Sequence, residues 1–165
     1  GGSEGITMLW VRTAIFLVVL PGTLFFYLPL WLARTPTSFA PLGPLRFLGL
    51  SCLLVGSTAL LWCMRDFVVR GRGTPAPIDP PSELVVRGLY RFVRNPMYVA
   101  GVVIVLGHFL WSQAAVLLAY TALVFLGFHL FVVLYEEPAL SRQFGEAYRE
   151  YRARVPRWVP QLGAR

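Results

Sequence analysis

The side chains best suited to chemistry lie at two separate places in a chain that is otherwise largely apolar. The first is the stretch YRFVRNPMY, residues 90–98, and the second is the acidic pair Glu136 and Glu137, which follows a long apolar run. Adjacent carboxylates at the end of such a run repel one another and lose hydration, so a nearby cation would stabilise them. The acidic pair is therefore predicted to bind a positively charged group.

The stretch 90–98 has the opposite preference. Asn95 is a favoured helix N-cap and Pro96 is favoured at the first helical position, so a helix is expected to begin there. The free N–H groups of a helix N-terminus attract anions, and Arg91 and Arg94 would add to that attraction. A simpler interpretation, in which both arginines only reach lipid headgroups, accounts for this stretch but leaves the acidic pair unexplained.

A ligand that suits both places carries a carboxylate for the arginines and an ammonium for a glutamate. S-adenosylmethionine has both groups, and its sulfonium cation is suited to acidic and aromatic walls. Tyr90, Tyr98 and Tyr135 are placed to supply such walls. We therefore predict S-adenosylmethionine as the cofactor, with S-adenosylhomocysteine as its product.

The composition of the chain is that of a membrane protein. Of its 165 residues, 56% are hydrophobic and 14% are charged, whereas charged residues make up about 25% of a soluble domain. All fifteen basic residues are arginine and the net charge is +7, a balance that suits nucleic acid or a membrane surface. Because the chain is so apolar, we predict an integral membrane protein whose partner is the lipid bilayer, with no nucleic-acid binding.

No metal site or disulfide is predicted. Cys52 and Cys63 stand eleven residues apart in one apolar run, which separates them by roughly 16 Å on a helix. A disulfide needs Cα atoms within about 7 Å of one another, so both are interpreted as packed thiols. The sequence contains no cluster of residues at metal-ligand spacing.

Long apolar runs indicate the fold. A helix that crosses a membrane takes about 20 mostly apolar residues. We predict an all-α integral membrane fold with about four transmembrane helices, at residues 9–33, 45–64, 96–111 and 114–135, followed by a C-terminal amphipathic helix. Pro21 and Gly22 are expected to kink the first helix. The third is short for a crossing, which tilt or local thinning of the bilayer would accommodate.

These helices divide the chain into five parts. They are a tag or disordered leader (1–7), a transmembrane hairpin (8–64), a Pro- and Arg-rich connector (65–95), a second transmembrane hairpin that carries the cofactor site (96–135) and an amphipathic tail that closes the site (136–165). Apolar residues at 140, 144, 148, 151 and 155 give the tail a helical stripe. Such a helix lies on the membrane surface or packs back on the domain.

The arginines indicate the orientation. With four crossings, thirteen of the fifteen fall on the side that holds the connector and both termini. Positively charged loops tend to stay in the cytoplasm. The N- and C-termini and the active site are therefore expected to be cytoplasmic, in a multi-pass protein of a bacterial inner membrane.

Three segments, taken in order, resemble one enzyme superfamily. They are GLYRFVRNPMYVAG (88–101), the pair EE (136–137) and FGEAYREYRARVPRWVP (144–160). Together they strongly resemble the isoprenylcysteine carboxyl methyltransferase and phospholipid methyltransferase superfamily, whose members are small integral membrane enzymes that use S-adenosylmethionine. The first two apolar segments match only in being apolar.

The superfamily pattern Gly-x-Tyr-Arg-x-x-Arg-His-Pro-x-Tyr-x-x-Gly is matched here by Gly88, Tyr90, Arg91, Arg94, Pro96, Tyr98 and Gly101. The departure is Asn95, which stands where histidine is commonest. Asparagine keeps the cap and a hydrogen bond but does not titrate near neutral pH, so Asn95 is expected to contact the cofactor rather than act as a base. The resemblance also implies that the tail helps to close the cofactor pocket through Phe144, Gly145, Tyr148, Tyr151 and Pro156.

Two histidines complete the candidates. His129 stands seven residues before Glu136 and so shares its helix face, where it would line the pocket or bond to a neighbouring helix; His108 is expected to be structural. The predicted catalytic residues are Glu136, Glu137 and Arg94. The predicted cofactor-binding residues are Tyr90, Arg91, Arg94, Asn95, Pro96, Tyr98, Gly101, His129, Glu136, Glu137 and Tyr148.

The predicted function is methyl transfer from S-adenosylmethionine to a membrane-embedded or hydrophobic acceptor, as in an isoprenylcysteine carboxyl methyltransferase. Because the donor is already activated, the protein mainly has to align the reacting atoms. A carboxylate acceptor needs no base, whereas an amine must lose a proton that Glu136 or Glu137 would take. The alternatives are a phosphatidylethanolamine-type N-methyltransferase or a thiol methyltransferase and, from other classes, an NADPH-dependent membrane reductase or a non-enzymatic membrane scaffold or small transporter.

Overall fold

The computed structural model describes residues 18–35, 41–67 and 83–161, together with the isolated residues 8, 11, 14, 15 and 69. Within this part of the chain every regular element is a helix, which confirms the all-α expectation there. The expectations for residues 1–7 and for most of the connector before residue 83 lie outside the described residues.

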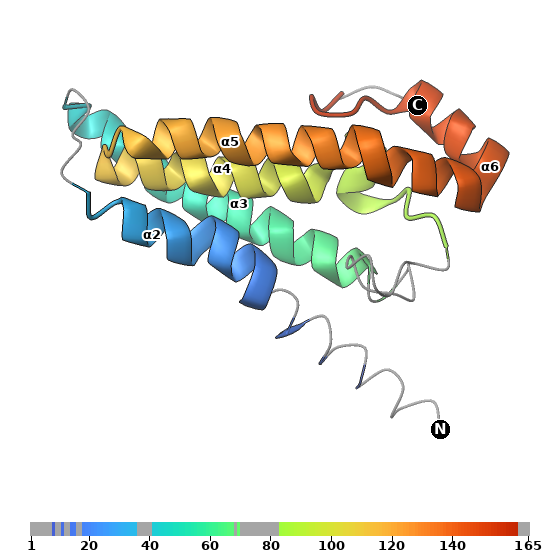
Figure 1. The fold of residues 1–165 in the computed structure, drawn as a ribbon, viewed down its shortest axis with the longest axis horizontal. Coiled ribbons are helices and arrows are strands. Elements are labelled where there is room, and N and C mark those ends of the chain that lie inside the picture. Colours follow the sequence, from blue (N-terminus) through green and yellow to red (C-terminus); the bar gives the residue numbers. More distant parts are fainter. Residues whose placement is uncertain are drawn as a thin grey trace.

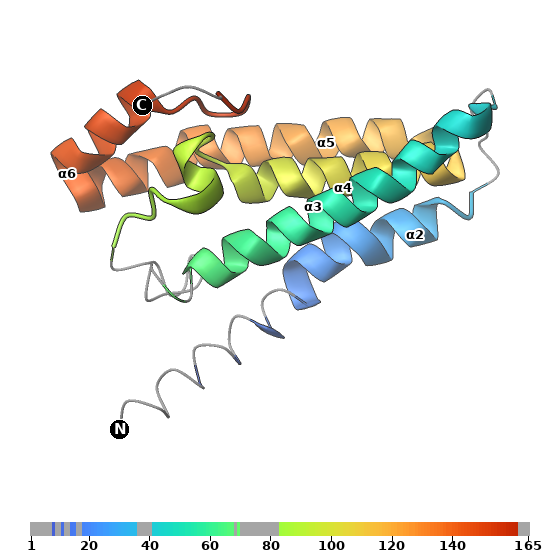
Figure 2. The same cartoon turned by 180° about the vertical axis from the view of Figure 1, so that it is seen from behind.

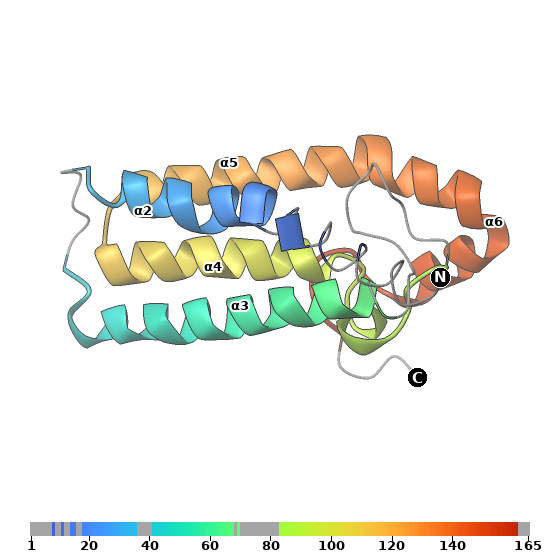
Figure 3. The same ribbon diagram turned by 90° about the horizontal axis from the view of Figure 1, so that it is seen from below.

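Three long helices form the body of the molecule. They are α3 (Phe47–Asp66), α4 (Pro96–Ser112) and α5 (Val116–Phe131), and α4 lies between the other two (Figures 1 and 3). Seen from behind, α3 runs obliquely across α4, with α2 (Leu28–Leu32) beside them (Figure 2). A short 3-10 turn, η2 (Gly43–Arg46), leads into α3. The middle position of α4 lets residues at its first turn meet groups from both sides.

Small residues allow α3 and α4 to approach closely. A Cβ atom added to Gly49 of α3 would lie 2.7 Å from the carbonyl oxygen of Gly107 on α4. One added to Gly56 would lie 2.9 Å from the carbonyl oxygen of Ala100. Both distances are too short for real side chains, so glycine is required at these positions. Small residues of this kind are what brings helix backbones together in membrane proteins.

The helix before α3 contains a π turn, η1 (Thr23–Tyr27), directly after the Pro-Gly pair expected to kink it. The backbone at Gly22 itself stays helical. The N–H of Leu28 bonds back five residues, to the first carbonyl of the turn, and Pro29 has no N–H to donate. The carbonyls of Leu24 and Phe25 thereby lose their usual helical donors.

Side chains from two other helices form hydrogen bonds with these carbonyls. Tyr120 of α5 donates its hydroxyl proton to the Leu24 carbonyl at 2.8 Å, and His108 of α4 hydrogen-bonds to the Phe25 carbonyl. Backbone groups inside a bilayer have no water to bond and need such partners. The two bonds tie the first helix to the α4–α5 hairpin and give His108 a structural place, as expected.

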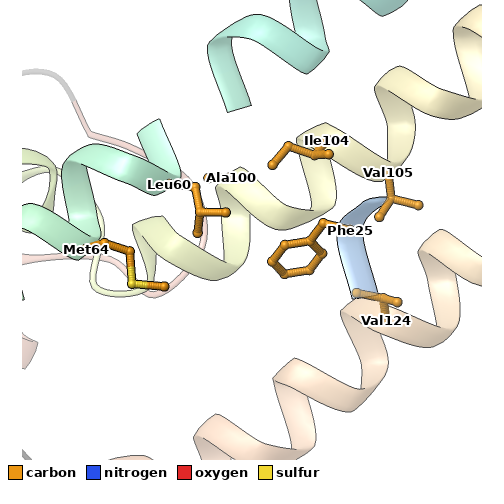
Figure 4. Packing of buried hydrophobic residues seen from close by; sticks show 7 residues of the cluster. All are labelled: Phe25, Leu60, Met64, Ala100, Ile104, Val105 and Val124. Carbon is orange, nitrogen blue, oxygen red and sulfur yellow. The ribbon is translucent and has the colours of Figure 1, made fainter. Parts of the chain in front are cut away.

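A compact apolar cluster fills the space between these helices (Figure 4). It consists of Phe25, Leu60, Met64, Ala100, Ile104, Val105 and Val124. Gly101 belongs to this contact, because an added Cβ there would collide with the Phe25 ring. The glycine that ends the superfamily pattern therefore makes room for an aromatic ring of the core.

At the other end of the hairpin, α5 continues through a second π turn, η5 (Val132–Glu136), into α6 (Glu137–Arg154). The Glu137 N–H bonds back five residues, to the Val132 carbonyl, and the next residue, Pro138, has no N–H. Such π turns are frequent at functional sites. This one lies where the acidic pair stands.

The tail helix α6 bends at Gly145, whose φ of 52° and ψ of −120° are not helical. A positive φ is easily adopted by glycine alone. Beyond the bend, Tyr148, Tyr151 and Val155 are buried together, with Leu84 of the connector packed against them. Of the two places predicted for the tail, the structure shows the second, in which it packs back on the domain.

The four predicted crossings differ in length. Helices Gly43–Asp66 and Val116–Arg154 contain apolar stretches long enough to cross a membrane, whereas Val18–Leu32 and Pro96–Ser112 are apolar but shorter within the described residues. By length and composition, two of the four predicted crossings are thus long enough to span a membrane. The third is short because Gln113 adopts a left-handed backbone, with φ of 59°, and ends α4.

Candidate functional site

A cavity of about 220 Å³ opens at the end of the bundle where α4 begins and α5 passes into α6. Its walls come from Phe67 at the end of α3, the connector, the first turn of α4, the end of α5, η5 and α6. The lining residues are Phe67, Leu84, Val85, Tyr90, Arg94, Asn95, Met97, Tyr98, Phe131, Val132, Tyr135, Glu136, Glu137, Ala139, Leu140, Gln143, Phe144, Tyr148 and Tyr151. The two chemically active stretches of the sequence therefore meet at one cavity.

Local backbone geometry brings the connector to this cavity. Gly88 has a φ of 60° and starts the 3-10 turn η4 (Gly88–Arg91), a conformation that glycine adopts without strain. The turn buries Tyr90, whose carbonyl accepts a 2.6 Å hydrogen bond from the hydroxyl of Tyr151 on α6. Helix α4 then begins at Pro96, as the Asn-Pro step predicts.

Glu137 is a buried carboxylate held by two arginines. Its Oε1 lies 2.7 Å from Arg94 Nη1 and 2.7 Å from Arg157 Nε, and its Oε2 accepts a bond from Arg157 Nη2 at 3.0 Å. Burial opposes ionisation, but the bond from Arg157 and the charges of both arginines outweigh it and hold the pKa of Glu137 below its ordinary value. Glu137 therefore stays ionised, and its negative charge is neutralised by two arginines of the protein itself.

Glu136 is in a different situation although it is the adjacent residue. Its Oε2 accepts a 2.9 Å hydrogen bond from the hydroxyl of Tyr98, and among the described residues it has no ion-pair partner. Burial raises the pKa of Glu136; the bond from Tyr98 partly offsets this, and the charge of Glu137 adds to the rise. Glu136 is thus the carboxylate that remains for a cation in the cavity.

Aromatic side chains complete the walls. The ring of Tyr98 stacks on Phe128 with 4.6 Å between centroids, which fixes the position of its hydroxyl beside Glu136. The hydroxyl of Tyr148 lies 3.5 Å from Arg94 Nη1. Negative charge next to aromatic faces is an arrangement that stabilises organic cations.

The chain beyond α6, residues 155–161, folds back along the connector, and we call it the C-terminal strap. The N–H of Arg94 donates to the carbonyl of Pro156 at 2.9 Å, and the N–H of Gln161 donates to the carbonyl of Phe92 at 3.0 Å. The indole N–H of Trp158 donates to His129 Nδ1 at 3.2 Å. The strap therefore joins the connector to α5 next to the cavity.

The structure brings seven of the predicted site residues to the cavity wall: Tyr90, Arg94, Asn95, Tyr98, Glu136, Glu137 and Tyr148. It places four others elsewhere. The guanidinium of Arg91 lies 4.5 Å from the ring of Phe92. Pro96 starts α4, and Gly101 packs against the core.

The other two outcomes concern His129 and Asn95. His129, the fourth residue placed outside the cavity wall, accepts the bond from Trp158, so of the two predicted roles it shows the bond to a neighbouring element. Asn95 makes no side-chain cap bond at α4. Its side-chain N–H instead donates to the carbonyl of Arg157 at 3.1 Å, because the strap lies within reach at that point.

Sequence reasoning missed Arg157 as a member of the site. It was counted only among the arginines of one membrane side, although it lies within the tail segment VPRWVP that carries part of the resemblance. Its partner Glu137 stands twenty residues earlier, across the bend at Gly145 and the turn into the strap. No helical spacing links two residues so placed.

Comparison with known proteins agrees with the resemblance. The profile of the phospholipid methyltransferase family matches residues 45–147. The nickel-cobalt-cadmium resistance protein NccN of Alcaligenes xylosoxydans xylosoxydans is 32% identical over 123 residues, which are 74% of this chain and 52% of that protein. The chain thus spans about half the length of this relative. No solved structure matches. The match over most of α3 to α6, with the cavity that those helices enclose, shows that the chain belongs to the phospholipid methyltransferase family, within the superfamily of isoprenylcysteine and phospholipid membrane methyltransferases.

Proposed function

We propose that the protein transfers a methyl group from S-adenosylmethionine to a membrane-embedded or hydrophobic acceptor, and that the cavity at the start of α4 holds the cofactor. The observation that carries this proposal is the cavity wall itself, where Glu136 has no cationic partner among the described residues and lies beside aromatic rings and a buried arginine. Few cellular ligands combine a carboxylate, an ammonium and a permanent organic cation as this cofactor does.

The residues present fit that ligand. Arg94 lines the cavity, and its buried Nε has no hydrogen-bond acceptor among the described residues. A ligand carboxylate would supply one, in a geometry that guanidinium groups favour. Glu136 would face the ammonium or sulfonium, with Tyr98 and Tyr135 as the aromatic wall.

The cofactor, when bound, supplies a methyl group already activated on positive sulfur. The protein then needs to orient that group, keep water away from it and, for an amine acceptor, take up one proton. Phe131, Tyr135 and Phe144 are placed to exclude water from the cavity wall. Glu136 can receive a proton from an amine acceptor, since burial raises its pKa and no arginine in the described part of the chain pairs with it.

The candidate acceptors are a prenylcysteine-like carboxylate, a phospholipid amine and a thiol. The family description names phospholipids, and a free carboxylate in the cavity suits an amine that must lose a proton. A carboxylate acceptor would be repelled by Glu136 in its ionised state. These three points favour the amine. Mass spectrometry of membrane lipids after incubation with isotopically methyl-labelled cofactor distinguishes the three.

We further propose that all four apolar helices cross the membrane, with both termini and the cavity on the cytoplasmic side of a bacterial inner membrane. The support is the arginine asymmetry of the sequence. Single cysteines introduced at positions 91 and 46, on opposite sides in this topology, test it in a variant without the two native cysteines. An impermeant thiol reagent added to right-side-out vesicles should label position 46 alone.

The metal resistance in the name of the relative is not carried over to this chain. Among the described residues there is no group of three or more His, Cys, Asp and Glu side chains that would hold a metal ion.

The proposed cofactor is tested by binding in lipid nanodiscs. S-adenosylhomocysteine should bind the purified protein at micromolar concentration and should not be displaced by NADPH. Preferential binding of NADPH would favour the reductase alternative. Failure to bind either ligand would favour the non-enzymatic scaffold, and binding that survives unchanged in Glu136→Ala and Arg94→Ala variants would place the ligand outside this cavity.

A further inference from the structure

The C-terminal strap meets the site through Arg157 in two ways at once. The backbone carbonyl of Arg157 accepts the side-chain bond of Asn95, at the start of α4. Its guanidinium contacts both carboxylate oxygens of Glu137, at the start of α6. Arg157 thus joins the first residues of two helices that line the same cavity, while it is itself not among the described residues lining that cavity.

The contacts continue from Glu137 to the cavity. Its Oε1 is shared between Arg157 Nε and Arg94 Nη1, each at 2.7 Å. A planar guanidinium that bonds both oxygens fixes the plane of a carboxylate, which a lysine ammonium does not do. The position of Arg94 is therefore set by a carboxylate whose own orientation is set by Arg157.

We propose that Arg157 is a positioning residue for methyl transfer: it holds Glu137, Glu137 holds Arg94, and Glu136 is left as the carboxylate that faces the ligand. This inference rests on the proposed function of the cavity. It divides the acidic pair into an ion-paired member that shapes the site and a free member that meets the ligand.

The charges of the four groups support the same distinction between an ion-paired Glu137 and a Glu136 that faces the ligand. Arg94 and Arg157 balance Glu136 and Glu137, so the four groups sum to zero. Without Arg157, Arg94 would be the one arginine left in hydrogen-bond contact with the acidic pair among the described residues. Glu137 would then be free to turn away from Arg94, and the arginine would lose the orientation that a ligand carboxylate needs.

The test is the affinity of the full chain in nanodiscs for S-adenosylhomocysteine, measured by isothermal titration calorimetry. Arg157→Gln should weaken binding about tenfold or more, and Arg157→Lys, which keeps the charge but loses the two-point contact, should fall between that variant and wild type. Arg154→Gln is the matched control, because Arg154 is exposed and, among the described residues, its ion-pair partner is Glu150 of the same helix. It should bind within twofold of wild type.

A double-mutant cycle separates positioning from simple support of the fold. If Arg157 acts through Glu137, then Arg157→Gln should cost little further affinity in a Glu137→Gln background. Asn95 offers a second, independent pair of variants. Asn95→Asp, which presents only acceptors to the Arg157 carbonyl when ionised, should weaken binding several-fold more than Asn95→His, which keeps an N–H donor for that carbonyl.

The pH dependence of binding supplies a readout that loss of folding does not imitate. Glu137 is faced by Arg94 from the start of α4, Arg157 from the strap, Arg152 and Tyr148 from α6, and Glu136 from η5. Removing Arg157 raises the pKa of Glu137, so the acid-side loss of affinity in Arg157→Gln should occur at higher pH than in wild type. Arg154→Gln should leave the pH profile in place.

Each outcome bears on one of two claims. If wild type does not bind S-adenosylhomocysteine, the proposed function fails. If wild type binds while Arg157→Gln matches the Arg154→Gln control, or if the effects of Arg157→Gln and Glu137→Gln on affinity simply add, the positioning role fails and the proposed function stands. Should Arg157→Gln not fold, the affinities of Arg157→Lys and of the two Asn95 variants test the positioning role instead.

Discussion

The ion pair between Arg94 and Glu137 predicts a large stability loss for Glu137→Gln. The two side chains are only 9% and 8% exposed, and they are 2.7 Å apart. Removing one partner of a buried pair leaves an uncompensated buried charge, which costs about 3–5 kcal/mol. Arg157 adds less to this figure, because its side chain is 31% exposed and water screens it.

This loss would be a large share of a total stability of about 5–15 kcal/mol. It is measurable by reversible denaturation in detergent micelles with tryptophan fluorescence as the signal. Glu150→Gln is the control, since its pair with Arg154 is exposed on both sides; it should cost less than about 1 kcal/mol. A Glu137→Gln protein within about 1 kcal/mol of wild type would refute the reasoning that this carboxylate neutralises a buried arginine.

The same pair separates stability from function. Replacing both partners, as Arg94→Met with Glu137→Leu, removes the buried unpaired charge and leaves Arg157, which is 31% exposed and reaches water. Buried pairs exchanged for apolar residues are often neutral for stability. The double variant should therefore be more stable than Glu137→Gln alone. It should still fail to bind S-adenosylhomocysteine, because the arginine that meets the ligand carboxylate is gone. Recovery of both properties would contradict the role proposed for Arg94.

Three further predictions concern pH, packing and the first helix. Because the folded-state pKa of Glu137 is depressed below 4.5, its contribution to stability should be fully present above that pH and lost as pH falls through the lower folded value, and Glu137→Gln should flatten this acid limb of a stability–pH curve. Gly101→Ala should cost about 1–3 kcal/mol in the same denaturation assay through collision with Phe25, whereas Gly127→Ala, which meets nothing within 4 Å, should not destabilise; equal effects of the two would contradict the close contact. Tyr120→Phe should cost about 1–3 kcal/mol, since it leaves the Leu24 carbonyl without its donor, and a neutral result would mean that another donor serves that carbonyl.

The start of α4 shows what could be predicted from sequence. The Asn-Pro step has a local meaning, because proline fixes the backbone for a first helical turn, and α4 begins at Pro96. The convergence of residues 90–98 with the acidic pair followed from two helices sharing one membrane face. Apolar runs likewise marked the helices, although their lengths as crossings depended on where each helix ended, as the left-handed Gln113 shows.

The C-terminal strap shows what could not be predicted from sequence. The side chain of Asn95 satisfies the local rule for an N-cap, yet it bonds to Arg157 instead, since a tertiary neighbour offers a carbonyl at hydrogen-bond distance. The partnership of Arg157 with Glu137 depends on the bend at Gly145, whose angle no pattern in the sequence specifies. Because both residues are glutamates, the sequence could not assign different roles to Glu136 and Glu137. Their hydrogen-bond and ion-pair partners in the fold distinguish them.

The central claim is that the cavity at the start of α4 holds the cofactor, and filling the cavity tests it most directly. Ala139 lines the cavity from α6, so Ala139→Trp should occupy part of its volume of about 220 Å³. Titration of S-adenosylhomocysteine into nanodiscs should show micromolar binding for wild type and for Gly127→Ala, and binding at least tenfold weaker for a folded Ala139→Trp protein. Unchanged affinity in Ala139→Trp would contradict the claim and place any cofactor elsewhere.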